Sequence, residues 1–244
     1  MTAGIKRKLK AFLIRRILGG TDSTPARPTR NFSELFSHVK KLGFQPGTVL
    51  DVGAASGTLS LHEAFPDADF ILFEPLKAFS AKLGKLKSKY RVEIHNCALS
   101  SKSKKGTIVR SKDLDGSSIL HDLDKNDERL ESIDIKTLDE VLKGKKLKKP
   151  VLLKTDCQGA DFDVIKGGVK TLKECELVIM EVSFFKFRGK KHSDPLEILN
   201  YMDKAGFCIY DILDGLYRPF DGALGQVDFV FVKKNSVFKS SAKW

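Results

Sequence analysis

Short apolar runs alternate with helical patterns along most of this chain of 244 residues. Runs such as 151–153 and 177–180 lack polar alternation, which is typical of parallel strands covered on both faces. The pattern predicts strands at 48–53, 70–74, 91–95, 150–155, 176–182, 207–213 and 227–233, and helices at 57–65, 77–88, 160–171 and 194–205. We therefore expect a doubly wound α/β sheet.

Two stretches depart from this alternation. Residues 214–226, between the last two strands, are rich in turn residues and too poor in helix signal for a crossover, so we expect an antiparallel pair there. The fold class is thus a mostly parallel sheet with an antiparallel edge strand. Residues 100–136 are less regular, with an extra strand at 105–110 and a loop at 116–120.

The amino terminus predicts an amphipathic helix outside this α/β pattern. Its apolar stripe consists of Ile5, Leu9, Phe12, Leu13 and Ile17. Gly19 and Gly20 end it, and a proline-containing linker follows to residue 30. A second helix begins at Phe32 and ends near Gly43. We expect a helix and linker at 1–30, one globular domain at 31–234 and a tail at 235–244.

Composition limits the class of protein. With 41% apolar and 30% charged residues, the chain is typical of a globular protein with one substantial core. Its cysteines (Cys97, Cys157, Cys175 and Cys208) have no metal-site spacing, so we expect reduced thiols in a cytoplasm. No apolar run approaches the roughly 20 residues of a membrane span, and the first residues do not resemble a signal peptide.

The net charge of +12 is concentrated at the amino terminus, where residues 1–30 hold eight basic side chains and one acidic side chain. A second basic run, 143–149, lacks the interleaved aromatic residues of a nucleic-acid platform, so a solvated loop is favoured over a nucleic-acid site. The basic, amphipathic segment 1–20 can pack on the domain. Its composition also suits peripheral contact with an anionic membrane, at the inner face of the membrane.

A turn of small residues follows the first strand. The run Val49-Leu-Asp-Val52 ends at Gly53, Ala54, Ala55, Ser56 and Gly57, and a helical pattern begins at Leu59. Glu74 ends the next apolar run, 21 positions after Gly53, which is the spacing of a carboxylate that accepts ribose hydroxyls. Only two glycines are present, so the turn lacks the cradle of a pyrophosphate. It suits S-adenosylmethionine, which has a ribose and no phosphate, although an ordinary α/β turn has the same pattern.

Seven motifs occur in order: Val49-Leu-Asp-Val-Gly-Ala-Ala-Ser-Gly57, Phe73-Glu-Pro75, Asn96-Cys-Ala-Leu-Ser100, Gly116-Ser-Ser118, Ile135-Lys-Thr-Leu-Asp-Glu140, Leu152-Leu-Lys-Thr-Asp-Cys-Gln-Gly159 and Val178-Ile-Met-Glu181. Through them the chain resembles the FkbM family of S-adenosylmethionine-dependent methyltransferases over about residues 30–234. The resemblance implies a class I methyltransferase fold and methyl transfer, most often to a hydroxyl of a sugar or another small metabolite. The family commonly has isoleucine at Thr155 and glutamate at Asp161, where the side chain of this protein is one methylene shorter.

The cofactor site is expected beyond the carboxyl ends of the strands. Asp51 and Gly53 would line its methionine and ribose side, and Glu74 would hold the ribose hydroxyls. Asn96 would frame the adenine with the backbone of Cys97 and Ala98, although Asn96 can also be a plain turn residue. The full cofactor-binding set is Asp51, Gly53, Ala54, Ser56, Gly57, Glu74, Pro75, Asn96, Cys97, Ala98 and Asp156.

Asp156, at a strand end, is the best candidate for a base or an acceptor of a substrate hydroxyl, although it can instead cap the helix that follows. Glu181 ends the next strand and can share the site. Two facing carboxylates can also hold a divalent metal ion, so base and metal ligand both stay open. His192 or His121 can act as a loop base or be solvated. Ser117, Ser118 and Gln158 are candidates for positioning the substrate.

The sequence therefore predicts a cytoplasmic O-methyltransferase that acts on a saccharide or another small polar acceptor. A nucleic-acid methyltransferase is the first alternative, but the chain has Asp156-Cys-Gln-Gly159 in place of the Asn/Asp-Pro-Pro-Tyr/Phe motif of many base-amino methylating enzymes. A catalytically silent partner protein that binds S-adenosylmethionine is the second.

Overall fold

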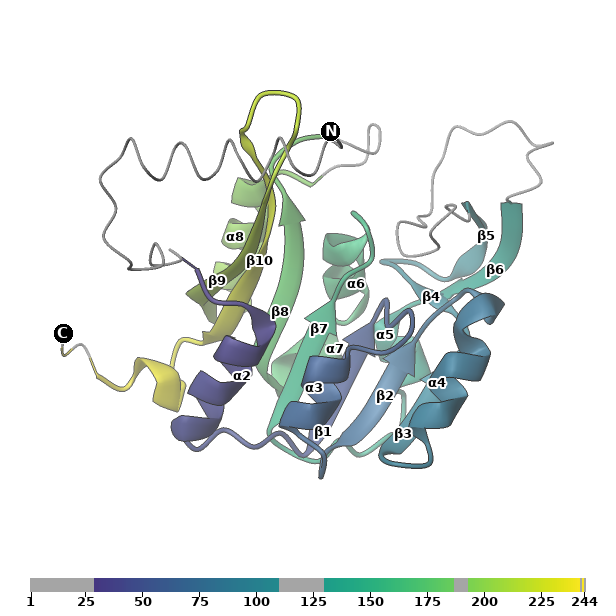
Figure 1. Ribbon diagram of the computed structural model, residues 1–244, viewed down its shortest axis with the longest axis horizontal. Coiled ribbons are helices and arrows are strands. Elements are labelled where there is room, and N and C mark those ends of the chain that lie inside the picture. Colours follow the sequence, from purple (N-terminus) through teal and green to yellow (C-terminus); the bar gives the residue numbers. More distant parts are fainter. Residues whose placement is uncertain (1–28, 110–129, 187–192, 242, 244) are drawn as a thin grey trace, which may run out of the picture.

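The computed structural model describes residues 29–109, 130–186, 193–241 and 243, and its centre is a seven-stranded sheet (Figure 1). The strand order is β3-β2-β1-β7-β8-β10-β9. These strands are β1 (Thr48–Val52), β2 (Asp69–Phe73), β3 (Arg91–His95), β7 (Val151–Thr155), β8 (Cys175–Ser183), β9 (Phe207–Tyr217) and β10 (Leu224–Lys233). Every strand predicted from the hydrophobic pattern is therefore present, within a few residues at each end.

The direction of the strands confirms the predicted fold class. Strands β3, β2, β1, β7 and β8 pair in parallel, while β10 is antiparallel to both of its neighbours, β8 and β9. The antiparallel pair lies at one end of the sheet, as expected. The last strand of the chain lies inside this pair, and the edge position belongs to β9.

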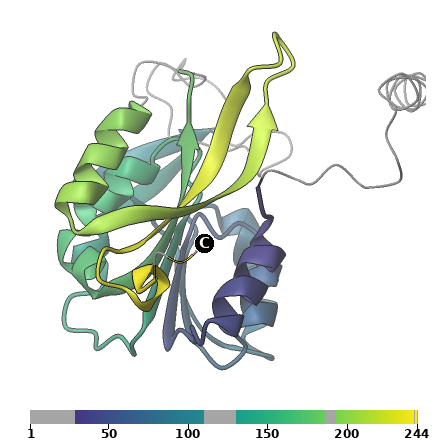
Figure 2. The same ribbon diagram turned by 90° about the vertical axis from the view of Figure 1, so that its left-hand side faces the viewer.

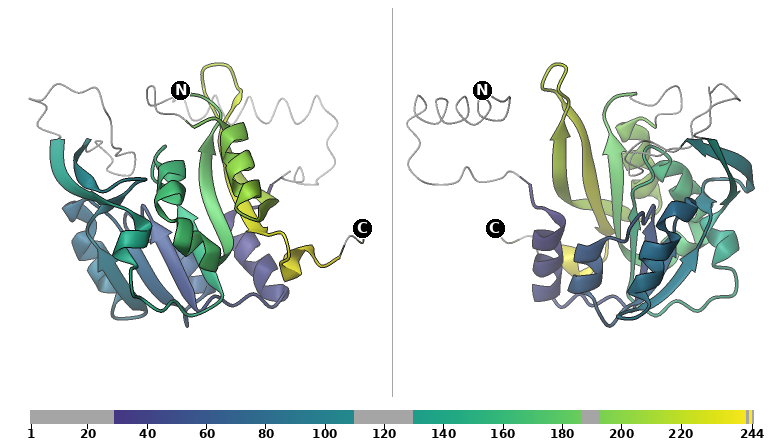
Figure 3. Two further views of the ribbon diagram at one scale, coloured as in Figure 1. Left: turned by 180° about the vertical axis from the view of Figure 1, so that it is seen from behind. Right: turned by 45° about the vertical axis from the view of Figure 1, so that its right-hand side comes forward.

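Helices cover both faces of the sheet, and neighbouring residues of a strand alternate between them. On β1, Val49 packs with α2 (Phe32–Lys41), α3 (Leu59–Ala64) and α4 (Ser80–Leu86), the last preceded by the short turn η1 (Lys77–Phe79). Leu50 packs on the other face, with α5 (Leu138–Val141), α6 (Asp161–Gly167), α7 (Val169–Glu174) and α8 (Pro195–Lys204). Figure 2 shows α2 and α8 on opposite sides of the sheet, and Figure 3 shows the α6–α8 side from behind.

Local sequence explains where these helices begin and end. Asn31 and Glu34 form a capping box at the start of α2, and Asp194 accepts a hydrogen bond from the backbone of Leu196 at the start of α8. The predicted helix 160–171 is divided at Gly167 and Gly168. A Cβ at Gly168 would lie 2.8 Å from Leu138, so the glycine that interrupts the helix also lets α5 approach.

A second, three-stranded sheet has the order β4-β6-β5, with β4 (Ala98–Leu99), β5 (Lys104–Val109) and β6 (Leu130–Lys136). The extra strand expected at 105–110 corresponds to β5. Strand β6 was not predicted, although Ile133 and Ile135 alternate as buried residues along it. The loop expected at 116–120 lies outside the described residues.

The amino-terminal helix expected over residues 5–17 and its linker also lie outside the described residues. Among the helices of the described ranges, none has the length and apolar content that a membrane crossing requires. The four cysteines are free. After β10 the chain forms one short turn, η2 (Val237–Lys239).

Candidate functional site

The carboxyl ends of β1, β2 and β7 lie side by side because the three strands pair in parallel and in register. Val52 is opposite Phe73 on one side and Thr155 on the other. The loops that follow these strands therefore meet at one edge of the sheet, which is where α/β proteins bind their ligands.

The turn after β1 requires its glycines. Gly53 has φ +76, and a Cβ there would lie 2.0 Å from the carbonyl oxygen of Asp156 in the turn after β7. The backbone amides of Gly53 and Ala54 both donate to the carbonyl of Phe73, at 3.0 and 3.2 Å. The absence of a side chain at Gly53 thus lets the three loops approach one another.

Glu74, at the end of β2, is 5% exposed and holds the glycine turn with its carboxylate. One oxygen accepts a hydrogen bond from the amide of Ala55 at 2.8 Å, and the other accepts from the amide of Leu76 at 2.9 Å. A carboxylate oxygen can accept more than one hydrogen bond, so this arrangement fixes the orientation of Glu74 and is compatible with further hydroxyl donors.

A pocket opens between these loops, with about 580 Å³ of empty space when the solvent at its open mouth is included. Its lining is Val52, Gly53, Ala55, Phe73, Glu74, Pro75, Leu76, Phe79, Cys97, Ala98, Leu99, Ile108, Asp156, Cys157, Gln158 and Ala160. Among these described lining residues, the only acidic side chains are Glu74 and Asp156, and there is no lysine, arginine or histidine. The wall on the β4 side is apolar.

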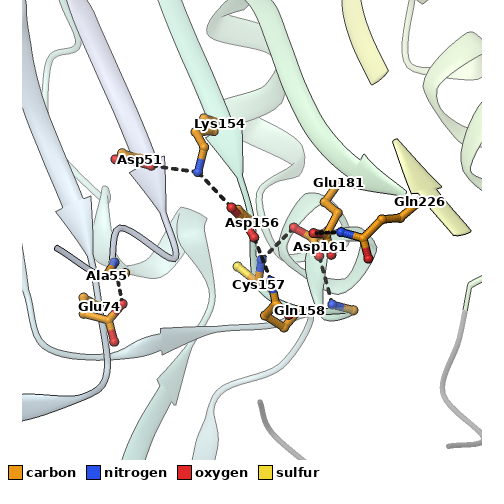
Figure 4. A network of polar contacts seen from close by, with 11 residues as sticks. Asp51, Ala55, Glu74, Lys154, Asp156, Cys157, Gln158, Asp161, Glu181 and Gln226 are labelled. Carbon is orange, nitrogen blue, oxygen red and sulfur yellow. Dashed lines mark hydrogen bonds and ion pairs between the residues drawn. The ribbon is translucent and has the colours of Figure 1, made fainter. Parts of the chain in front are cut away.

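The turn after β7 fixes Asp156 from two sides. Its Oδ1 accepts a hydrogen bond from Gln158 Nε2 at 3.1 Å, and Lys154 Nζ lies 3.4 Å from Oδ2 (Figure 4). Gln158 and Gly159 both have positive φ, +53 and +99. The carboxylate of Asp161 accepts hydrogen bonds from the amides of Cys157 at 2.9 Å and Gly159 at 3.2 Å. These bonds stabilise the strained turn.

Lys154 is an ionic residue that the sequence analysis did not identify. It lies in an apolar strand and is 4% exposed, with its ammonium 3.5 Å from Asp51 Oδ1 and 3.4 Å from Asp156 Oδ2. Burial opposes the charge of Lys154, but Asp51, Asp156 and Asp228 outweigh it and raise the pKa of the ammonium. Lys154 is therefore a buried cation between two carboxylates.

The sequence also did not identify Asp161 and Asp228 as groups that interact electrostatically with Asp156. Burial, and then the charge of Asp156, raises the pKa of Asp161 to about 6 and the pKa of Asp228 to about 7. Asp228 lies on β10 opposite Glu181 of β8, and Gln226 Nε2 donates to Glu181 Oε2 at 2.8 Å. A row of polar groups thus runs from Asp156 toward β10.

The structure brings part of the predicted set together in the pocket: Gly53, Glu74, Pro75, Cys97, Ala98, Asp156 and Gln158. Six other members lie nearby but outside this lining: Asp51, Ala54, Ser56, Gly57, Asn96 and Glu181. Asn96 Nδ2 donates to the hydroxyl of Ser80 at 3.3 Å and to the carbonyl of Glu74 at 3.5 Å, so Asn96 contacts the loop after β2.

Ser117, Ser118, His121 and His192 lie outside the described residues. Within the described residues, no group of three or more histidine, cysteine, aspartate or glutamate side chains is arranged to hold a metal ion.

The strand order and the pocket beyond the strand ends define a class I methyltransferase fold. The chain belongs to the family of FkbM methyltransferase domains, whose model matches residues 51–209. It is accordingly a methyltransferase of the S-adenosylmethionine-dependent class, as the resemblance implied. No curated protein sequence matches it.

Solved structures similar to the chain include an S-adenosylmethionine-dependent methyltransferase from Clostridium acetobutylicum, with 10% identity and a TM-score of 0.47 over 94% of this chain and 99% of that chain. Another is the 1,6-didemethyltoxoflavin-N1-methyltransferase of Burkholderia thailandensis with bound S-adenosylhomocysteine, with 14% identity and a TM-score of 0.41 over 96% and 91%.

The residues of the pocket fit S-adenosylmethionine. Gly53 leaves room where a Cβ would collide with the backbone, and the apolar wall suits a purine. Glu74 is a carboxylate of the kind that accepts ribose hydroxyls in α/β folds, and the described lining contains no cation for a phosphate. Asp156 adds a second negative charge for a ligand that carries a sulfonium cation.

Proposed function

We propose that the protein transfers a methyl group from S-adenosylmethionine to a hydroxyl of a saccharide or another small polar acceptor. The observation that carries this proposal is the carboxylate of Asp156. It lines the pocket beside Gly53 and is held in place by Gln158 on one oxygen and Lys154 on the other. A carboxylate fixed in this way can orient an attacking hydroxyl and accept its proton.

In this proposal Glu74 accepts the ribose hydroxyls, and the backbone of Cys97 and Ala98 borders the adenine. Asp51 and the turn Gly53, Ala54, Ser56 and Gly57 surround the methionine and ribose side, with Pro75 and Asn96 completing the set. Asp51 is buried behind the pocket, so its action on the cofactor is through Lys154 and the turn.

The cofactor supplies an electrophilic methyl group on a positively charged sulfur. The acceptor oxygen would displace the sulfur from the methyl carbon, with the electron pair of the broken bond left on sulfur. The hydroxyl proton passes to Asp156. The task of the chain is to hold the hydroxyl in line and to keep water out of the pocket.

Glu181, Ser117, Ser118 and His192 stay in this proposal as acceptor-side residues. The hydrogen bond from Gln226 orients the Glu181 carboxylate, which supports a role in holding acceptor hydroxyls. A divalent metal ion between Asp156 and Glu181 remains a separate prediction. Chelation followed by addition of magnesium tests it, because a metal-dependent reaction stops and restarts.

The experiment is incubation of the full chain with methyl-labelled S-adenosylmethionine and separate pools of glycans, small polyols and RNA, followed by mass analysis. We expect label in an alkali-stable ether of a glycan or polyol, and a far lower rate of labelling with Asp156→Asn under the same conditions. Label in RNA would replace the proposal with the nucleic-acid alternative. Cofactor binding without transfer to any pool would favour the silent partner protein.

We also propose that the chain consists of a basic segment at 1–30, a methyltransferase domain at 31–234 and a tail at 235–244, and that it works in the cytoplasm. The charge of the first 30 residues supports peripheral contact of residues 1–20 with the inner, anionic face of a membrane. Such contact would bring the pocket close to acceptors that are anchored in lipid.

A further inference from the structure

The buried lysine behind the pocket connects two neighbouring strands. Lys154 on β7 is opposite Asp51 on β1 in the parallel register, and Asp51 is 0% exposed. Neither carboxylate oxygen of Asp51 accepts a hydrogen bond from the described residues. The ammonium of Lys154, 3.5 Å from Asp51 Oδ1, is therefore the group that balances this buried charge.

The same ammonium also acts on the side of the pocket. It lies 3.4 Å from Asp156, whose carboxylate lines the pocket, so Asp51, Lys154 and Asp156 form one chain of charges (Figure 4). The charged groups that act on Lys154 from the surrounding elements are Asp51, Asp156 and Asp228, and all are acidic. Within the described part of the chain, Lys154 is the cation of this cluster.

The charge of this cluster matters because the cofactor changes its own charge in the reaction. The sulfur of S-adenosylmethionine is a cation, and the sulfur of the product, S-adenosylhomocysteine, is neutral. The two molecules otherwise share their adenosine and their amino-acid group. A change of one unit in the charge behind the pocket therefore acts on the first ligand much more than on the second.

We propose that Lys154 determines how strongly the pocket distinguishes S-adenosylmethionine from S-adenosylhomocysteine. It acts through Asp51 and Asp156: by neutralising Asp51, it limits the negative charge that faces the sulfonium. The inference rests on the proposed cofactor but goes beyond the proposed acceptor and base. The negative charge that remains in the cluster attracts the sulfonium, and methyl transfer removes this attraction, which favours release of the product.

Three variants change the formal charge of this pair. Lys154→Met removes one positive charge, Asp51→Asn removes one negative charge, and the double variant leaves the net charge as in the wild type. The ligands are S-adenosylmethionine, S-adenosylhomocysteine and sinefungin, which carries an ammonium group in place of the methyl sulfonium. Calorimetry at pH 8 measures each affinity, and circular dichroism checks that each variant is folded.

The ratio of the affinities for the cationic and the neutral ligand is the decisive quantity. We expect Lys154→Met to raise it on the order of tenfold and Asp51→Asn to lower it by a similar factor. The double variant should return to within about threefold of the wild type. Lys154→Arg, which keeps the positive charge, should keep the wild-type ratio. Sinefungin should follow S-adenosylmethionine.

A purely structural role predicts another pattern, in which the affinities for all three ligands fall together and the double variant is no better than the single ones. That result overturns the inference. If Lys154→Met does not fold, Asp51→Asn and the double variant still decide it, because only the charge account predicts that the second substitution restores the ratio. Wild-type protein that binds none of the ligands also overturns it. Methylation of no acceptor, together with the expected ratios, would instead reject the proposed acceptor.

Discussion

The side chain of Glu74 provides a direct test of the cofactor site at the scale of one residue. Its carboxylate is 5% exposed, lines the pocket and is oriented by two backbone amides. We expect Glu74→Ala to weaken S-adenosylmethionine binding by about 2–4 kcal/mol, from two charge-assisted hydrogen bonds lost. Calorimetry measures the change, with the exposed Glu63→Ala on α3 as control. Unchanged affinity in a folded Glu74 variant would remove this residue from the cofactor site.

Substitution of Asp156 tests its proposed role in catalysis separately from cofactor binding. Asp156→Asn keeps the size of the side chain, but its amide nitrogen is a donor and cannot replace an oxygen that accepts from Gln158 or Lys154. Nor can it accept a proton as a carboxylate does. We expect turnover to fall on the order of 100-fold or more, while affinity for the neutral S-adenosylhomocysteine is retained. Single-turnover kinetics and calorimetry measure the two quantities. A parallel loss of product affinity would show that Asp156 mainly builds the cofactor pocket.

Asp228 predicts a pH dependence of stability. Burial and the charge of Asp156 raise its pKa to about 7, whereas an unfolded aspartate titrates near ~3.9. Between these values the folded state binds more protons than the unfolded state, so the free energy of unfolding falls as pH rises from about 4 to 7. Relative to Asp228→Asn, the wild type should lose on the order of 2–4 kcal/mol over that range. The same change of unfolding free energy with pH in the two proteins, measured by denaturation, would contradict this.

The sequence identified some of these residues and missed others for a physical reason. Glu74 and Asp156 follow apolar runs directly, and strand ends in a parallel sheet meet at one edge, so their place could be predicted. Lys154 stands inside the run Val151–Thr155, where only the parallel register with β1 reveals its partner Asp51. That register is a tertiary property, so no local pattern contains it.

At the scale of elements, the close approach of the turns after β1 and β7 depends on Gly53. A Cβ there would lie 2.0 Å from a backbone oxygen. Any other residue at this position would also have to adopt φ +76. We expect Gly53→Ala to lower the free energy of unfolding by about 2 kcal/mol or more. Gly84→Ala is the matched control, because a Cβ at Gly84 in α4 has nothing within 4 Å and should stabilise the helix by about 0.5–1 kcal/mol. Urea denaturation of both variants should show opposite shifts, and a neutral Gly53→Ala would contradict this account.

The elements themselves were predicted where the pattern was local and missed where it was not. The inner strands β2 and β8 contain continuous apolar runs, and Asn31 and Asp194 mark helix starts. By contrast, β6 forms through pairing with β5 and β4, and Ala98 and Leu99 of β4 are paired with Ile135 and Lys136. Such short strands are defined by a distant partner, so the alternation along 130–136 alone did not identify one.

For the whole molecule, the hydrophobic pattern did not predict the order of the last two strands in the sheet. The sequence predicted an antiparallel pair but not that β10 lies inside β9. Burial gives the reason: the segment Phe229–Val232 of β10 is buried on both faces, whereas most residues of β9 are half-buried or exposed, including Ile209 and Ile212. A continuous apolar run suits an interior strand, and a half-exposed strand suits an edge.

The last prediction concerns the attachment of the molecule to membranes. Six basic residues between Lys6 and Arg16 surround the apolar stripe of the predicted amino-terminal helix. At about 1 kcal/mol per basic side chain near an anionic surface, partly offset by the cost of ordering, reversible binding is feasible. The full chain should therefore sediment with anionic vesicles, stay in solution with neutral vesicles and be released by high salt.

A shortened chain beginning at Thr29 is the comparison, because it keeps the ion pair of Arg30 with Asp211 and the cap at Asn31. It should remain in solution with both kinds of vesicle. A full-length variant with the six basic residues replaced by glutamine should behave in the same way, which separates the effect of charge from the effect of truncation. If the unaltered chain ignores anionic vesicles at low salt, the segment packs on the domain or on another copy, and the membrane proposal is wrong.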